Sequence, residues 1–248
     1  FSALNYFDGC TIDLGTSATK LTILDMNEKN IPESAASLSA CDYIIINDYD
    51  TSLISDNQYE SIKNWVMEGG ILIIGTGSKY QGVFNKFQDG FINGTIGELS
   101  KETITLLLKG NKLSNNESSA NNKNDNELND NESNDNESNE EELIGSKLSG
   151  VDVLNYEFEE SDFINGISEE GFESSLNIGL GKVVVLGYNL GMAPISNWDA
   201  RVELAQNLIA GTMSESIQNK LNNDERKNLL EAQNLVNNIP YMEDVKAP

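Results

Sequence analysis

Residues 41–78, CDYIIINDYDTSLISDNQYESIKNWVMEGGILIIGTGS, contain the pattern that decides the fold. The run YIII at 43–46 is apolar and mostly β-branched, which predicts a strand that is covered on both faces. Apolar residues then recur at helical spacing until Gly69 and Gly70, which end the helix because glycine tolerates a left-handed backbone. The run ILII at 71–74 predicts a second buried strand. The stretch therefore predicts a βαβ unit, in which the two strands are parallel.

Similar patterns lie on both sides of this unit. Helices that alternate with buried strands are typical of an α/β fold with helices on the faces of a parallel sheet. We therefore expect an α/β, flavodoxin-like three-layer sandwich with a mainly parallel central sheet. The further segments behind this prediction are strands at 20–24, 102–109, 151–158, 174–178 and 181–187, and helices at 33–39 and 199–210.

Composition divides the chain into three parts. Residues 111–142 are almost free of apolar side chains and repeat NDNEL, NDNES, NDNES, so they cannot bury enough surface to order themselves. We expect them to be a disordered acidic insertion within one domain, residues 1–213. Residues 214–248 read as a polar helix followed by a connector. Because Phe1 lies inside an apparent helix, we expect the chain to be a piece of a longer protein, with a further strand upstream.

The charge and the missing residue types exclude several function classes. The chain carries 40 acidic against 16 basic residues, a net charge of -24, which argues against nucleic acid as a partner because phosphates require a basic surface. There is no histidine, so Ser-His and Cys-His catalytic pairs cannot form. The two cysteines, Cys10 and Cys41, are either separate small buried residues or a disulfide, and their spacing leaves both alternatives open.

A candidate ligand site follows the first strand of the βαβ unit. Asp48, Asp50 and Ser52 lie where open α/β sheets bind ligands, at the carboxyl ends of the strands. Two carboxylates two residues apart suit a hard cation such as Mg²⁺ or Ca²⁺. The loop is similar to the D-x-S-x-S metal site of von Willebrand A-like domains. It also resembles the D-x-D-x-T nucleophile loop of haloacid-dehalogenase-like phosphatases, in which Thr76 would take the role of the following strand-end hydroxyl.

Two further interpretations of these loops remain open. Aspartates at a strand end can simply terminate the strand and cap the next helix. The sequence GTGS at 75–78, which ends at Ser78, can cradle a phosphate or carboxylate with its backbone N–H groups, or it can be a tight turn that requires glycine. Three interpretations of the loop therefore stay open. It can belong to a metal-dependent, phosphatase-like hydrolase, with Asp48 as nucleophile and Asp50 as general acid, or to a cation-dependent adhesion domain. It can also be a strand end that binds no ligand.

The pattern CDYIIINDYDTS…IKNWVMEGGILIIGTG, with GKVVVLGYNLGMAPISNW later in the chain, resembles the class I glutamine amidotransferase-like domains. It is most similar to those of uncharacterised extracellular, membrane-anchored proteins of Gram-positive bacteria. The resemblance implies an extracellular location, with the anchor in segments outside this chain. Because this sequence has neither the histidine nor the cysteine elbow of that family's triad, we expect a non-catalytic interaction or sensing domain without a cofactor, whose ligand is a protein or a component of the cell envelope.

Overall fold

The computed structural model describes residues 3–13, 18–107, 145–159, 162–163, 167–213 and Ile217. The predicted insertion at 111–142 and, apart from Ile217, the predicted C-terminal helix and connector at 214–248 lie outside the described residues.

The predicted βαβ unit is confirmed. Strand β3 (Tyr43–Asn47) pairs in parallel with β4 (Ile71–Gly75), and helix α2 (Asp56–Met67) connects them. The helix begins with a capping box, in which Ser55 Oγ accepts from Gln58 N at 3.2 Å and Gln58 Oε1 accepts from Ser55 N at 3.0 Å.

The central sheet is mixed, with strand order β3-β4-β9-β8-β7. Strand β9 (Gly181–Leu186) is parallel to β4, whereas β8 (Glu173–Ile178) and β7 (Asp162–Phe163) are antiparallel to their neighbours. Two residues, Gly179 with a φ of 63° and Leu180, connect β8 to β9. A connection this short can join only antiparallel strands, because a parallel pair requires a crossover of a dozen residues or more.

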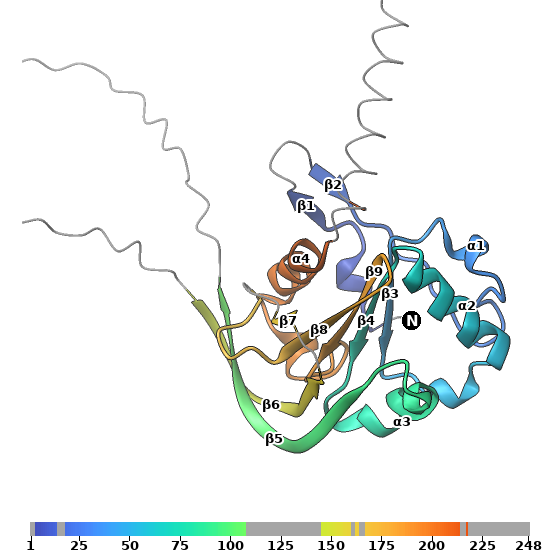
Figure 1. Ribbon diagram of the computed structural model, residues 1–248. Helices are drawn as coiled ribbons and strands as arrows, with labels where there is room; N and C mark the ends of the chain where they lie inside the picture. Colours follow the sequence, from blue (N-terminus) through green and yellow to red (C-terminus); the bar gives the residue numbers. More distant parts are fainter. Residues whose placement is uncertain are drawn as a thin grey trace, which may run out of the picture.

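Two antiparallel pairs lie outside this sheet (Figure 1). Strands β1 (Thr11–Asp13) and β2 (Ala18–Lys20) form a small hairpin, so the strand predicted at 20–24 is wrong beyond Lys20. Strands β5 (Gly94–Leu107) and β6 (Gly145–Phe158) form a long curved hairpin. With a mixed sheet, two separate hairpins and only two long helices among the described residues, the predicted flavodoxin-like sandwich with a mainly parallel sheet is wrong.

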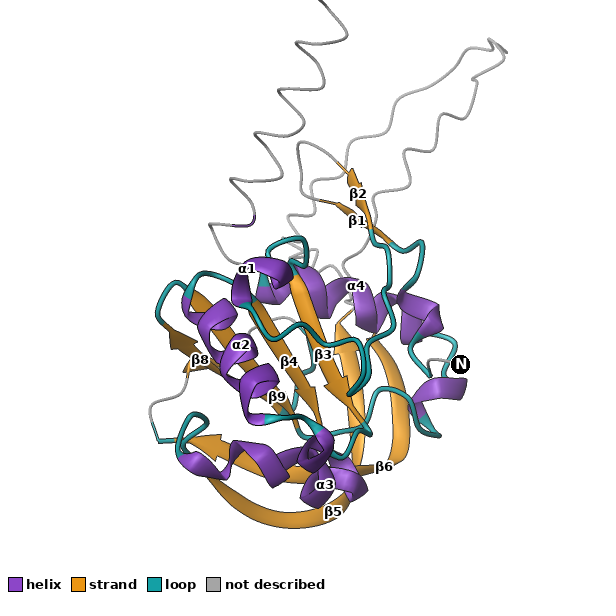
Figure 2. Ribbon diagram, turned by 90° about the vertical axis from the view of Figure 1, so that its right-hand side faces the viewer, coloured by secondary structure: helices purple, strands orange, loops and turns teal. Residues whose placement is uncertain are grey.

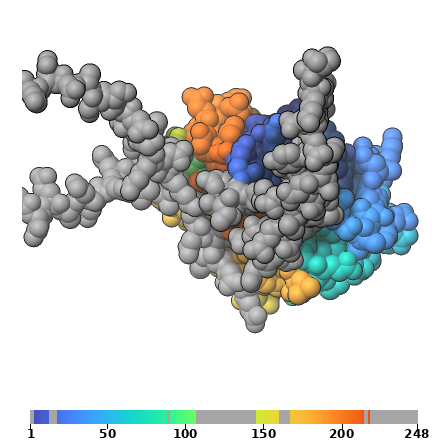
Figure 3. Space-filling model, turned by 90° about the horizontal axis from the view of Figure 1, so that it is seen from above, coloured from blue at the N-terminus to red at the C-terminus, as the bar shows by residue number. Residues whose placement is uncertain are grey.

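Helices lie against both faces of the central sheet. Helices α1 (Ala35–Leu38) and α2 lie on one side and α4 (Arg201–Thr212) on the other, as Figures 1 and 2 show. Helix α4 begins two residues later than predicted, with Ala200 at its N-cap. The β1–β2 hairpin lies beside α4 (Figure 3), where Gln206 Nε2 donates to Thr11 O. The remaining helical segments are α3 (Tyr80–Phe84) and the short 3₁₀ turns Asn5–Phe7, Thr51–Leu53, Gly77–Lys79, Asn85–Asp89 and Ile195–Asn197.

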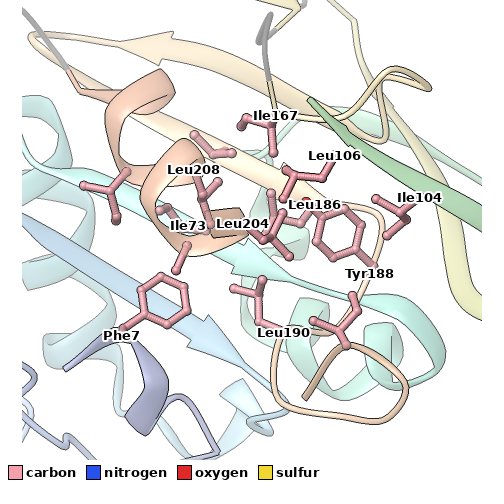
Figure 4. Packing of buried hydrophobic residues seen from close by; sticks show 14 of the residues in the cluster. Phe7, Ile73, Ile104, Leu106, Ile167, Leu186, Tyr188, Leu190, Leu204 and Leu208 are labelled. Carbon is pink, nitrogen blue, oxygen red and sulfur yellow. The ribbon is translucent and has the colours of Figure 1, made fainter. Parts of the chain in front are cut away.

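The core has two apolar clusters, one on each face of the sheet. Figure 4 shows the cluster on the α4 side, where Phe7, Ile73 and Leu204 meet. Strands β4 and β9 are almost completely buried, as their apolar runs predict. Strand β3 is not, because it is the edge strand of the sheet, and of its residues only Ile46 is buried. Its two faces are both partly covered, as the apolar run predicts, because Tyr43 and Ile45 pack against one cluster and Ile44 and Ile46 against the other.

Candidate functional site: the C-terminal edge of the sheet and a groove beside β3

The predicted acidic loop is built mainly from local hydrogen bonds. Asp50 Oδ1 accepts from Asn85 Nδ2 and from Ser52 N, both at 3.0 Å. The hydrogen bond from Asn85, followed by those from Ser52, lowers the pKa of the Asp50 carboxyl. Asp50 thereby caps the 3₁₀ turn Thr51–Leu53, as a strand-terminating aspartate does.

The other predicted site residues point in different directions. Asp48 has a positive φ of 53°, and one of its oxygens lies 4.0 Å from Lys79 Nζ. The Thr76 side chain is buried and donates to Leu186 O at 2.7 Å, so it faces β9 rather than the acidic loop. Ser78 lines a small cavity with Asn189. No three His, Cys, Asp or Glu side chains within the described ranges lie together as a metal site requires. A Mg²⁺ or Ca²⁺ site here stays a prediction.

The long hairpin covers the carboxyl ends of β4 and β9. Leu154 N donates to Gly187 O at 2.7 Å, and a Cβ at Gly77 would lie 3.0 Å from Asp152 O. What remains between them is a cavity of about 20 Å³ lined by Ser78, Asp152 and others. Such a volume holds a single water-sized molecule. This cavity, at the edge where open α/β folds bind their ligands, is therefore too small for a substrate.

Two asparagines that the sequence analysis missed connect the end of β3 to the loop after β9. Asn47 Nδ2 donates to Asn189 Oδ1 at 2.9 Å, and Asn47 Oδ1 accepts from Leu190 N at 2.8 Å. Gly191 N donates to the same Asn189 oxygen at 2.9 Å. The two contacts of Asn47 join residues more than 140 positions apart, so no sequence spacing indicates them.

The buried anchor of the acidic loop is Thr51, which the sequence analysis did not single out. Its Oγ1 donates to Val83 O and accepts from Lys86 N, both at 2.9 Å. We expect Thr51→Val to lower the free energy of unfolding by about 2 kcal/mol, because it removes both of these hydrogen bonds from a buried position. Urea unfolding followed by circular dichroism measures this. The exposed Ser52→Ala is the matched control, and equal midpoints for the two variants would contradict the expectation.

A groove of about 970 Å³ runs along the outer edge of β3. Strand β3 forms one wall, and the segment 20–27, which continues from β2 without strand pairing, forms the other. On the α4 side the lining includes Phe7, Ile12, Ile209, Met213 and Ile217, and on the α2 side it includes Met26, Ile31, Ile54 and Ile62. The volume and the apolar lining are those of a ligand pocket.

The sequence analysis missed this groove. The sequence holds two signals of it: the apolar run at 43–46, which requires apolar neighbours on both faces, and Leu21 with Ile23 in the segment that follows β2. By itself the second signal predicts the strand at 20–24.

The two cysteines are thiols without a disulfide between them in the described part of the chain. Cys10 is buried, and its Sγ donates to Tyr6 O at 2.9 Å. Cys41 lines the groove. In the structure the two thiols are not joined to each other, and Cys41 is only half-buried.

Comparisons with known proteins give structural neighbours of low similarity. Two proteins from Salmonella typhimurium, cytoplasmic protein STM1381 (strain LT2) and cytoplasmic protein STM3548, share 12% and 15% sequence identity, each with a TM-score of 0.45. The matches cover 82% and 74% of this chain, and 94% and 76% of those proteins. The exo-β-1,4-mannosidase Op5Man5 from Opitutaceae bacterium strain TAV5 matches over 72% of this chain at 12% identity and a TM-score of 0.38.

This chain spans about a quarter of the mannosidase, 26% of its length. No protein-family model matches the chain, and no curated protein sequence matches it. Over the described residues, no helix has the length and hydropathy of a membrane span.

Proposed function

We propose that the chain is a non-catalytic interaction domain that holds a partner in the groove beside β3. One observation carries this proposal: the apolar groove of about 970 Å³ lies along an edge of β3 that no other strand of the described residues pairs with, whereas the cavity beside the carboxyl ends of β4 and β9 is about 20 Å³. An unpaired strand edge is a ready template for another chain. The acidic composition and the resemblance to extracellular membrane-anchored domains support a location outside the cell.

Selection from a random peptide display library tests the proposal. We expect peptides enriched on the full-length protein to lose binding at least tenfold in Leu24→Lys. The Leu24 side chain lines the groove but is 68% exposed, so the substitution is compatible with folding. Leu180→Lys is the matched control, because Leu180 is 74% exposed and lies on the β8–β9 turn, outside the groove. Ile45→Lys, in the other wall, is a second groove variant.

Two results would overturn the proposal. One is the absence of any enriched peptide whose binding distinguishes Leu24→Lys from Leu180→Lys. The other is a rise of the melting temperature in millimolar Mg²⁺ or Ca²⁺ that Asp48→Asn/Asp50→Asn loses, since a ligand that binds only the folded state stabilises it. That result would favour the metal-dependent hydrolase or adhesion alternatives instead.

A further inference from the structure

We propose that the ligand of this groove is a single extended strand of about five residues on a partner polypeptide, apolar on both faces and flanked by Lys or Arg. It would pair with the outer edge of β3 and so lengthen the central sheet by one strand. This inference rests on the proposed function and specifies the partner's chemistry and its mode of binding.

The backbone of β3 provides the pairing groups. Ile71 N donates to Asp42 O, so the N–H and C=O groups of Asp42, and by alternation those of Ile44 and Ile46, point toward β4. The groups of the residues between them, Tyr43, Ile45 and Asn47, therefore point into the groove.

The opposite wall of the groove, within the described residues, forms no hydrogen bonds with the outward-pointing main-chain groups of β3. In the segment 20–27, Leu21 N donates to Cys10 O at 2.8 Å and Ile23 N donates to Asp8 Oδ1 at 3.1 Å. Within the described residues, no hydrogen bond is found between this segment and β3. The outer edge of β3 can therefore accept a strand by main-chain pairing, as sheet-extending peptide complexes do.

The volume of the groove corresponds to one strand. A five-residue strand is about 16 Å long, and with a strand spacing of about 4.8 Å and a sheet thickness of about 10 Å it fills roughly 800 Å³. The groove measures about 970 Å³. Because β3 and the segment 20–27 wall it on two sides, it accommodates one extended chain, whereas a second folded copy of the domain is too large to enter.

The two faces of the groove determine the side chains of the ligand. Successive residues of a strand point to opposite faces of the sheet. One set would meet Ile209 and Met213 on the α4 side, and the other would meet Met26 and Ile62 on the α2 side. A strand that is apolar on both faces reads as a continuous Val- and Ile-rich run rather than an alternating one.

Charge determines the flanks of the ligand. The lining contains three carboxylates, Asp25, Asp42 and Asp48, against one ammonium, Lys20. The chain as a whole carries a net charge of -24. Lys or Arg on either side of the apolar run would therefore accelerate association and favour this partner over a second copy of the same acidic chain.

The test uses the full 248-residue chain and a fluorescent peptide, Lys-Lys-Val-Ile-Val-Ile-Val-Lys-Lys, at concentrations where the peptide is monomeric. Fluorescence anisotropy measures binding. We expect saturable binding that falls at least tenfold in Leu24→Lys and persists in Leu180→Lys. Replacing the flanking lysines by glutamates should weaken binding, and rising salt should remove that difference. N-methylation of alternate residues, which removes the pairing N–H groups, should weaken binding at least tenfold in one of the two possible registers.

Hydrogen exchange provides a readout specific to strand pairing. The Tyr43, Ile45 and Asn47 amides should exchange more slowly with the peptide bound. Unchanged exchange, or equal binding of both N-methylated peptides, would overturn strand pairing but leave the groove as a binding site. A second variant carries the same strand fused ahead of Phe1. If the free peptide does not bind but the fused strand protects these amides, the partner proposal is overturned, because the occupant of the groove would then be an attached segment. If the proposed function itself is wrong, the library selection will also enrich no peptide whose binding depends on the groove. That outcome separates failure of the proposed function from failure of strand pairing.

Discussion

Gly181→Ala should destabilise the protein by about 3 kcal/mol, because the added methyl group would meet backbone atoms that cannot move aside. A Cβ at Gly181 would overlap the carbonyl oxygens of Val66 and Gly70, at the point where α2 ends and the chain turns into β4. Lys182 N donates to Gly70 O at 3.1 Å, so relief of the clash would also break a contact between β9 and this turn. For a chain of this length the melting temperature would fall by roughly 6–12 °C.

Gly82→Ala is the matched control for this prediction. Gly82 lies inside α3, its backbone φ is not positive, and the nearest atom to an added Cβ is Asp50 Cα at 3.8 Å. The same glycine-to-alanine change should therefore stabilise the protein by about 0.5–1 kcal/mol, since alanine has less conformational freedom to lose on folding. Urea unfolding of both variants checks the pair, and a Gly181→Ala midpoint equal to that of the wild type would contradict the packing of β9 against the end of α2.

The second large effect concerns a buried carboxyl group, Glu173, at the start of β8. Its side chain is fully buried, and it accepts hydrogen bonds from Tyr188 Oη at 2.7 Å and from Ser168 Oγ at 2.9 Å. Burial raises the pKa of Glu173, Glu170 nearby adds to the rise, and the two hydroxyl hydrogen bonds offset it only in part. We expect Glu173→Gln to be more stable than the wild type at pH 8, by more than the 0.5 kcal/mol typical of surface substitutions.

The sign of the pH dependence follows from the direction of this shift. An unfolded glutamate titrates near pH 4.3, whereas the pKa of folded Glu173 is higher. Between these two values the folded state keeps a proton that the unfolded state has lost, so this residue's contribution to stability falls as the pH rises. The contribution is fully present below about pH 4.3 and is lost once the pH exceeds the folded pKa. The difference between Glu173→Gln and the wild type should therefore vanish near pH 4 and grow toward pH 8.

Thermal unfolding at a series of pH values between 4 and 8 checks this expectation. Glu169→Gln is the control, because it removes the same formal charge from an exposed position of the neighbouring segment. The comparison is needed because removing any one of 40 acidic groups reduces charge repulsion in this chain. Equal pH profiles for Glu173→Gln and Glu169→Gln would contradict the buried position of Glu173.

Local pattern was sufficient for the βαβ unit. The strands at 43–46 and 71–74 and the helix between them were predicted because each is specified by a run of neighbouring residues, and the structure confirms all three. The direction of β8 was not predicted, because a two-residue turn at Gly179 and Leu180 reverses a chain whose apolar pattern is equally compatible with either direction. That reversal, with the two separate hairpins, made the flavodoxin-like prediction wrong.

The candidate sites divide in the same way. Sequence alone determined the acidity, the absence of histidine-based catalysis, the βαβ unit and the position of the acidic loop after its strand, since these depend on composition and on residues close together in the chain. Only the tertiary structure decided that β3 lies at the edge of the sheet, that β6 covers the carboxyl ends of β4 and β9, and that the segment 20–27 lies across a groove from β3. Each of these features depends on which distant segments lie side by side, and hydrophobic periodicity specifies the faces that a strand buries but not the neighbours that cover them.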